Sequence, residues 1–388
     1  MHRIPRIVAA IVLLAIAVGG WVAAPRGTLA ASEVVGHVYV NDNTAGTNTI
    51  AAFDQHQNGR LTPMLSPLFS AGGAGTGTAI GSQGALQISS DGDYLLAVDA
   101  GSNQISVLHI GDAGRLQLVG SPISSNGIQP VSIGVHRDLV YVANAGNGTS
   151  GSNYTGFRFN SGGELHPLSG STVLLKSTAL PGDVLFNATG THLIGTEIGT
   201  SLVDSFTVGD NGRLAAAPGS PFAAQAAGPF GSEFRPANPS QLYVSNAHAG
   251  ANLGSISAYN VTARGVLDPI GASPYLNKQT ASCWVEITHD GRYLFTVDTA
   301  SSAISRYRIG EDGGLSLLGS TVFNDPTGLG PFDARLDPAG RNLYVVDNGL
   351  DMVSGFAVDE GTLTELPSSP FALPAHATPF GIVVTQSD

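Results

Sequence analysis

Short apolar segments with strand-like alternation recur along the whole chain, and the most regular of them end in an acid or amide, several after a Tyr-Val pair. Seven such polar positions follow one another at a spacing of roughly fifty residues. They are Asp42, Asp99, Asn144, Glu197, Asn246, Asp298 and Asp347. A period of this length that holds only strand-like segments predicts a radial array of small β-sheets.

A second element, Gly-x-Leu, repeats in phase with the first. Its copies are Gly59/Leu61, Gly114/Leu116, Gly163/Leu165, Gly212/Leu214, Gly265/Leu267, Gly314/Leu315 and Gly361/Leu363. The sixth copy is one residue short in this alignment. We therefore predict an all-β fold, a seven-bladed β-propeller with four-stranded antiparallel blades.

The pattern also predicts the strand that begins each blade, next to the central channel. These segments are Gly84–Ser89, Val131–His136, Gly182–Asn187, Phe230–Arg235, Cys283–Thr288, Phe332–Asp337 and Phe380–Thr385. The last segment has no partner strands after it, whereas the chain starts at a second strand. We expect Phe380–Thr385 to close the ring in the first blade, which removes a free sheet edge.

The N-terminus resembles an export signal, because Arg3 and Arg6 precede an apolar run and Thr28-Leu29-Ala30 offers small residues for cleavage. We predict a signal peptide at residues 1–30, with a membrane anchor as the alternative, and a propeller at residues 31–388. The chain would then be exported: secreted, periplasmic or anchored by its N-terminus. Its one cysteine, Cys283, allows no internal disulfide and is expected to be a buried structural thiol.

The net charge of −12 and the absence of basic runs beyond the N-terminus argue against nucleic acid as a partner. Alignment of the inner strands places Glu233, Glu286 and Arg335 at one position in three consecutive blades. A carboxylate can activate water and an arginine can stabilise an oxyanion, so we predict these three as catalytic residues. The alternative is a buried structural ion-pair network.

Residues closer to the start of the inner strands are predicted to contact substrate. They are Asp183, Phe230, Phe332, Asp333 and Phe380. The ring of acids and amides is expected to be structural, bonding to turn amides, with a Ca²⁺ site as the weaker alternative. The glycine-rich stretch from Gly72 to Gly84 predicts a loop over the channel mouth. We expect no cofactor and no metal.

Two runs resemble a known family. Gly228-Pro229 with Leu242-Tyr243-Val244, and Gly330-Pro331 with Leu343-Tyr344-Val345, are similar to propeller lactonases of the bacterial 6-phosphogluconolactonase type and to the wider YVTN-type surface propellers. That family commonly has Arg-His after Gly-Pro, whereas this chain has Phe230-Gly231 and Phe332-Asp333. The polar groups of the family therefore have no counterpart at these positions.

The resemblance implies a metal-independent lactone hydrolase, of the carboxylic ester hydrolase class, that acts on a sugar-type lactone. An exported chain would not meet a phosphosugar, so another small-molecule lactone or carbohydrate is expected. The alternative is a non-catalytic exported propeller that binds a cell-surface glycan or protein. In both cases we expect a monomer.

Overall fold

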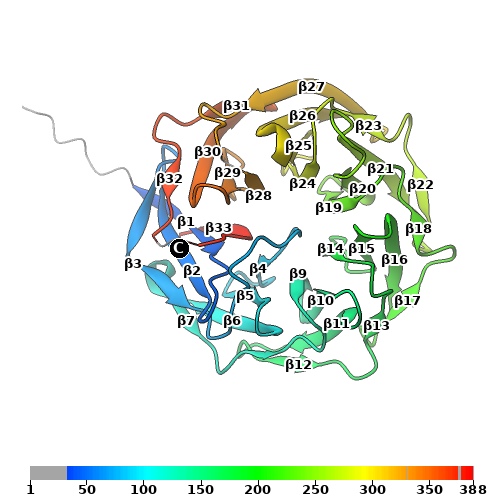
Figure 1. Ribbon diagram of the computed structural model, residues 1–388, viewed down its shortest axis with the longest axis horizontal. Helices are drawn as coiled ribbons and strands as arrows, with labels where there is room; N and C mark the ends of the chain where they lie inside the picture. Colours follow the sequence, from blue (N-terminus) through cyan, green and yellow to red (C-terminus); the bar gives the residue numbers. More distant parts are fainter. Residues whose placement is uncertain (1–32, 329, 375–376, 388) are drawn as a thin grey trace, which may run out of the picture. The chain divides into compact units, whose positions relative to one another are not determined.

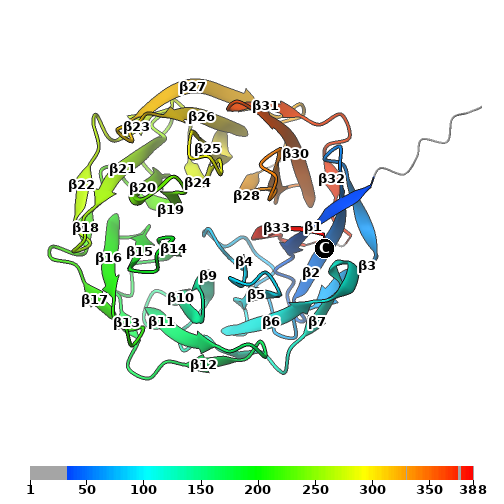
Figure 2. The ribbon, with the colours of Figure 1, turned by 180° about the vertical axis from the view of Figure 1, so that it is seen from behind.

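The computed structural model describes residues 33–387 apart from Leu329, Ala375 and His376. The predicted signal segment lies outside the described residues. Residues 33–387 form seven β-sheets arranged in a ring around a central axis (Figures 1 and 2). The predicted seven-bladed propeller is therefore confirmed. Among the described residues, no helix is long and apolar enough to cross a membrane.

The first two strands of each blade lie nearest the axis. The innermost strands, from blade 1 to blade 7, are β33 (Ile382–Gln386), β4 (Leu86–Ile88), β9 (Pro130–His136), β14 (Pro181–Phe186), β19 (Pro229–Arg235), β24 (Ser282–Ile287) and β28 (Pro331–Leu336). The second strands are β1 (Val34–Asn41), β5 (Tyr94–Asp99), β10 (Leu139–Ala145), β15 (His192–Glu197), β20 (Asn238–Asn246), β25 (Tyr293–Asp298) and β29 (Asn342–Asp347). All seven predicted inner strands are present within a few residues of their predicted bounds.

The third strands are β2 (Thr49–His56), β6 (Gln104–Ile110), β11 (Ser152–Phe159), β16 (Leu202–Val208), β21 (Ser255–Val261), β26 (Ala303–Ile309) and β30 (Met352–Asp359). The outermost strands are β3 (Leu61–Ser70), β7 (Leu116–Leu118), β12 (Leu165–Pro167), β17 (Leu214–Ala216), β22 (Leu267–Pro269), β27 (Leu315–Val322) and β31 (Thr362–Glu365). In five blades a two-residue strand continues the outer position after a break: β8 (Ile123–Ser124), β13 (Val173–Leu174), β18 (Phe222–Ala223), β23 (Tyr275–Leu276) and β32 (Phe371–Ala372). Two 3₁₀ turns, η1 (Asp112–Gly114) and η2 (Thr299–Ser301), complete the elements of the described residues.

The two ends of the described chain meet in blade 1. Strand β33 pairs antiparallel with β1, with Val38 opposite Val384, and no other strand of blade 1 lies closer to the axis. The predicted closure of the ring by the C-terminal strand is confirmed. Because β33 completes blade 1, β1 is paired on both sides, like the second strands of the other blades.

The two sequence repeats contact each other between neighbouring blades. The Tyr39 hydroxyl donates to the Gly114 carbonyl of the next blade at 2.6 Å, and Tyr344 donates to Gly59 across the closure at 2.8 Å. Tyr243 donates to the Gly313 carbonyl at 2.8 Å, and Gly313 has a positive φ of 87° like other glycines of this repeat. The sixth copy is therefore Gly313-x-Leu315 at full length, and our alignment on Gly314 was wrong.

Each of the four aspartates in the ring of acids and amides accepts a hydrogen bond from a hydroxyl group. Thr49 donates to Asp42 at 2.6 Å, and Ser354 donates to Asp347 at 2.6 Å, in each case from the third strand of the same blade. Ser305 does the same for Asp298 at 2.6 Å. These side chains therefore fasten the second strand to the third, and not to turn amides as we expected.

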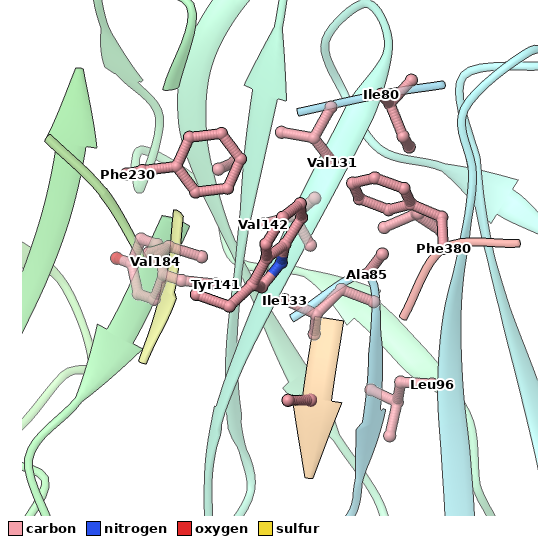
Figure 3. Packing of buried hydrophobic residues seen from close by; sticks show 14 of the residues in the cluster. Ile80, Ala85, Leu96, Val131, Ile133, Tyr141, Val142, Val184, Phe230 and Phe380 are labelled. Carbon is pink, nitrogen blue, oxygen red and sulfur yellow. The ribbon is translucent and has the colours of Figure 1, made fainter. Parts of the chain in front are cut away.

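The largest apolar cluster surrounds the start of the inner strands. Figure 3 shows Phe230, Phe380, Ile80 and Val131 converging there from different blades. Sheets that are covered on both faces need few charged residues, which fits a chain that is 42% hydrophobic and 12% charged.

Candidate functional site

Trp284 lies near the start of the inner strand β24 and contacts aromatic rings from three other blades. Its ring lies 4.9 Å from Phe230, 5.0 Å from Phe332 and 6.3 Å from Phe380, measured between ring centroids. Trp284, Phe230 and Phe380 are 5% exposed or less. We call these four residues the aromatic layer. It fills the linker-side end of the channel.

The predicted catalytic residues lie one layer further along the same strands. Glu233 and Arg335 follow Phe230 and Phe332 by three residues, about 10 Å of extended chain. Normally residues three apart in a strand point to opposite faces. Here the ladders of β19 and β28 shift register before these residues, and the shift brings both positions to the channel side.

Glu286 and Arg335 form an ion pair across blades 6 and 7, with Arg335 Nη1 3.3 Å from Glu286 Oε2. The second carboxylate oxygen of Glu286 accepts the Leu336 amide at 3.0 Å. The side chain of Glu286 is 8% exposed and that of Arg335 is 22% exposed. Burial alone would lower the pKa of Arg335, but the carboxyl groups of Glu286 and Asp333 raise it. The guanidinium therefore stays charged.

Glu233 is the carboxyl group of this cluster that lacks such a fixed partner. Its side chain is partly exposed. Burial, reinforced by the negative charge of Glu286, raises the pKa of Glu233 to about 8, while Arg335 acts in the opposite direction. Glu233 therefore exchanges its proton near neutral pH, as a group that transfers protons must.

Asp183 and Asp333 complete what we call the charged layer, with Glu233, Glu286 and Arg335. Ser232 donates to Asp183 through its hydroxyl at 2.6 Å and its amide at 2.9 Å. Burial raises the pKa of Asp183 and that of Asp333 to about 7 each. Four carboxyl groups thus surround one guanidinium, and burial keeps part of them protonated at neutral pH.

The structure separates the residues predicted to contact substrate from solvent. Asp183 is 3% exposed, Asp333 0%, Phe230 5% and Phe380 0%, whereas Phe332 is partly exposed. In this arrangement the phenylalanines pack on Trp284 and Asp183 joins two blades. Contact with a ligand stays a prediction for these five residues.

The second half of the glycine-rich stretch, which we predicted to lie over the channel mouth, is buried against the inner strands. Ser82 is 0% exposed and Gln83 is 4% exposed. Trp284 Nε1 donates to the Ser82 carbonyl at 2.8 Å. The chain itself therefore blocks the linker-side mouth together with the aromatic layer.

Sequence reasoning missed Trp284 and Gln83. In the alignment of the inner strands, Cys283 and not Trp284 is equivalent to Phe230 and Phe332. Trp284 takes the place of these rings because the ladder of β24 skips a residue between Ser282 and Trp284. Gln83 directly precedes a predicted inner strand, a position at which the other six blades have proline or serine. A long polar side chain at this position was the sequence feature that could have indicated its role.

Cys283 lies beside Trp284 and is 7% exposed. Burial raises the pKa of this thiol to about 12, which disfavours the nucleophilic thiolate, and the predicted burial is confirmed. Within the described part of the chain, no group of three or more His, Cys, Asp or Glu side chains has an arrangement that would hold a metal ion.

A family comparison bears on this site. Residues 233–379 match the model of the lactonase, seven-bladed β-propeller family. The matched segment includes Glu233, Glu286 and Arg335, and the resemblance to propeller lactonases is confirmed. Among curated proteins, no significant match was found.

Solved structures share the fold. A proposed 6-phosphogluconolactonase from Bacteroides uniformis aligns over 91% of this chain and 100% of its own, with a TM-score of 0.73 and 18% identity. The periplasmic gluconolactonase of Pseudomonas aeruginosa aligns over 91% of this chain and 100% of its own, with a TM-score of 0.70 and 16% identity. At these identities the similarity establishes the propeller alone.

Proposed function

We propose that this lactonase-type propeller hydrolyses a neutral sugar-type lactone without a metal. The observation that carries the proposal is the pairing of unlike carboxyl groups in the channel. Glu286 is fixed by Arg335 and a backbone amide, whereas Glu233 is partly exposed and has neither bond, and burial raises the pKa of both carboxyl groups. Two carboxyl groups in such different environments suit different roles in one reaction.

In this reaction ionised Glu233 takes a proton from water as the water oxygen attacks the lactone carbonyl carbon. Arg335 stabilises the negative charge that develops on the carbonyl oxygen. The bond between the carbonyl carbon and the ring oxygen then breaks, and Glu233 returns the proton to that oxygen. Glu286 holds the guanidinium in place. The product is the open-chain hydroxy acid.

The charge of the site favours a neutral substrate. Four carboxyl groups face one guanidinium, so a phosphorylated lactone would meet net negative charge. We further propose that the protein works outside the cytoplasm, as the N-terminal sequence indicates. The gluconolactonase of Pseudomonas aeruginosa that shares the fold is a periplasmic protein, which is consistent with export.

The experiment measures acid release from a panel of neutral sugar lactones by purified residues 31–388. We expect kcat/KM to rise as pH increases toward 8, since Glu233 must be ionised, after subtraction of spontaneous hydrolysis. Glu233→Gln and Glu286→Gln should abolish turnover. Glu164→Gln, at a side chain that is 64% exposed in blade 3, is the control. An inactive wild type, or an active Glu233→Gln, would contradict the proposal.

A second candidate is a non-catalytic propeller that binds a cell-surface glycan or protein. The observation that favours it is the filling of the linker-side mouth by Ser82, Gln83 and the aromatic layer. Such a protein would bind its partner on the outer surface. Glycan-array binding that survives Glu233→Gln, from a protein inert toward lactones, would support this second function.

A further inference from the structure

The linker between blades 1 and 2 is anchored deep in the channel by blades to which it does not belong. Ser82 Oγ donates to the Val131 carbonyl of blade 3 at 2.5 Å. Its own carbonyl accepts Trp284 Nε1 of blade 6 at 2.8 Å. These buried bonds hold the following residue, Gln83, on the channel axis.

Gln83 then bonds to three further strands. Its amide donates to the Gly182 carbonyl of β14 at 2.9 Å. Its side-chain Nε2 donates to the Ser232 carbonyl of β19 at 2.9 Å, and its Oε1 accepts the Val285 amide of β24 at 2.9 Å. Ser232 and Val285 immediately precede Glu233 and Glu286. One side chain therefore spans the two strands that carry the glutamates.

Such a bridge matters because inner strands of neighbouring blades belong to separate sheets with no ladder between them. The distance between β19 and β24 depends on side-chain contacts and on bonds of this kind. The fit is tight, since a side chain at Gly231 would overlap Gln83 Oε1. A buried amide that bonds at both ends resists displacement, because its loss leaves the Ser232 carbonyl and the Val285 amide buried without this partner.

We propose that Gln83 is a positioning residue that sets the spacing of Glu233 and Glu286 and keeps water out of the linker side of their site. This inference rests on the proposed function for its role in catalysis. The positioning itself is a property of the protein that is measurable without any activity.

The groups that face Glu233 define the expected effect. They are Glu286 on β24, Asp183 on β14 and Arg335 on β28, and burial has the largest influence on its pKa. Loss of the Gln83 bridge lets water reach the carboxyl group and lets the two glutamates separate. Both changes favour the ionised form, so the pKa of Glu233 should fall toward its usual value.

The test compares Gln83→Met with wild type by carbon-13 NMR titration of labelled glutamate carboxyl groups, with Glu233→Gln providing the assignment. Methionine keeps the length and removes both side-chain bonds. We expect the pKa of Glu233 to fall by about one unit, a tenfold change in proton affinity. Cys283, beside Trp284, should also react faster with a thiol reagent.

Gln241→Met is the matched control. Gln241 is also buried, at 4% exposed: its Oε1 accepts Arg235 Nη1 of the same blade at 2.9 Å, and its Nε2 donates to the Asp312 carbonyl of blade 6 at 3.2 Å. Neither bond involves Glu233, Glu286 or the residue that precedes each of them. Loss of Gln241 should lower stability without moving the pKa of Glu233. An unchanged pKa in Gln83→Met, or an equal shift in both variants, would overturn the inference.

Two further measurements keep the outcome decisive. If Gln83→Met does not fold, the exchange rate of the Val285 amide hydrogen is measured in the wild type instead. This amide donates to Gln83, so it should exchange only through global unfolding. Fast exchange would rule the bridge out. If wild type hydrolyses lactones, the pH at half-maximal kcat/KM should shift with the pKa of Glu233. A protein that is inactive but shows the NMR shift loses the proposed function and keeps the positioning role of Gln83.

Discussion

The aromatic layer and the charged layer lie next to each other and have opposite character: Glu233 and Arg335 follow Phe230 and Phe332 by three residues, and Glu286 follows Trp284 by two. Phe230 and Trp284 are packed among other rings and make no charge contact. Glu233 and Arg335 lie next to them along the axis and depend on one another's charge. The comparison indicates that apolar packing fills one part of the channel and that the neighbouring part holds buried ionisable groups, whose burial costs stability.

The largest difference between the two layers should appear in how the free energy of unfolding depends on pH. Several carboxyl groups of the charged layer contribute to this dependence, and their effects add. Burial raises the folded-state pKa of Asp183 and Asp333 to about 7 and of Glu233 to about 8, above the usual values near 4. The folded state therefore holds more protons than the unfolded state between about pH 4 and pH 8. Stability should fall as pH rises through this window.

Denaturant unfolding at pH 5 and pH 8 tests this, with the higher free energy of unfolding expected at pH 5. The double variant Asp183→Asn, Glu233→Gln should reduce the difference. A free energy that rises from pH 5 to pH 8 would show that these carboxyl groups are ionised in the folded protein.

Removal of the central ring should be the most damaging single substitution. Trp284→Ala leaves a cavity among three phenylalanines and unpairs the Ser82 carbonyl. We expect a loss of about 3–5 kcal/mol in the free energy of unfolding. Glu233→Gln, in the other layer, should change it by less than about 1 kcal/mol at pH 7, where Glu233 is largely protonated. A loss below about 1 kcal/mol for Trp284→Ala would mean that the channel collapses around the gap.

Arg335→Met should be costly only where its partners are ionised. The substitution leaves Glu286 buried without its cation, and we expect a loss of about 2–4 kcal/mol at pH 8, below the full cost of a completely buried pair because the guanidinium is 22% exposed. The loss should shrink at pH 5 as the carboxyl groups take up protons. Chemical denaturation at both values measures it, and an equal loss at both would assign Arg335 a packing role.

The smallest effect is expected for Phe332→Leu. Phe332 is partly exposed and stacks on Trp284 at 5.0 Å, so the change keeps apolar volume and removes one aromatic contact. We expect about 1 kcal/mol, equal at pH 5 and pH 8. A pH-dependent loss would show that the aromatic layer shields the charged one.

The repeat made the ring predictable. Each blade carries an acid or amide at the end of its second strand and the same Gly-x-Leu turn. In four blades a tyrosine also contacts the glycine of the next blade, as Tyr39 and Gly114 do. A contact that recurs leaves a periodic trace in the sequence. The chain starts at a second strand, and its last predicted strand has no partner strands after it. These two observations likewise predicted that residues near Phe380 complete blade 1.

The interior of the channel was less predictable because it is not periodic. Gln83 bonds to strands of three blades about 100 to 200 residues away, and no local pattern encodes such contacts. The equivalent positions of Glu233, Glu286 and Arg335 could be predicted by aligning the inner strands. Their burial and the raised pKa of Glu233 could not, because both depend on which side chains surround them in space. Trp284 was hidden by a one-residue shift of the ladder.

The pairing of β33 with β1 has a consequence for biosynthesis. Residues 382–386 are translated after every other strand of the ring, so blade 1, the first to be synthesised, is the last to be finished. Until then β1 presents unpaired backbone groups at its inner edge. A nascent chain, or one truncated before residue 382, therefore lacks the innermost strand of blade 1. The ring can close only after residues 382–386 have been translated.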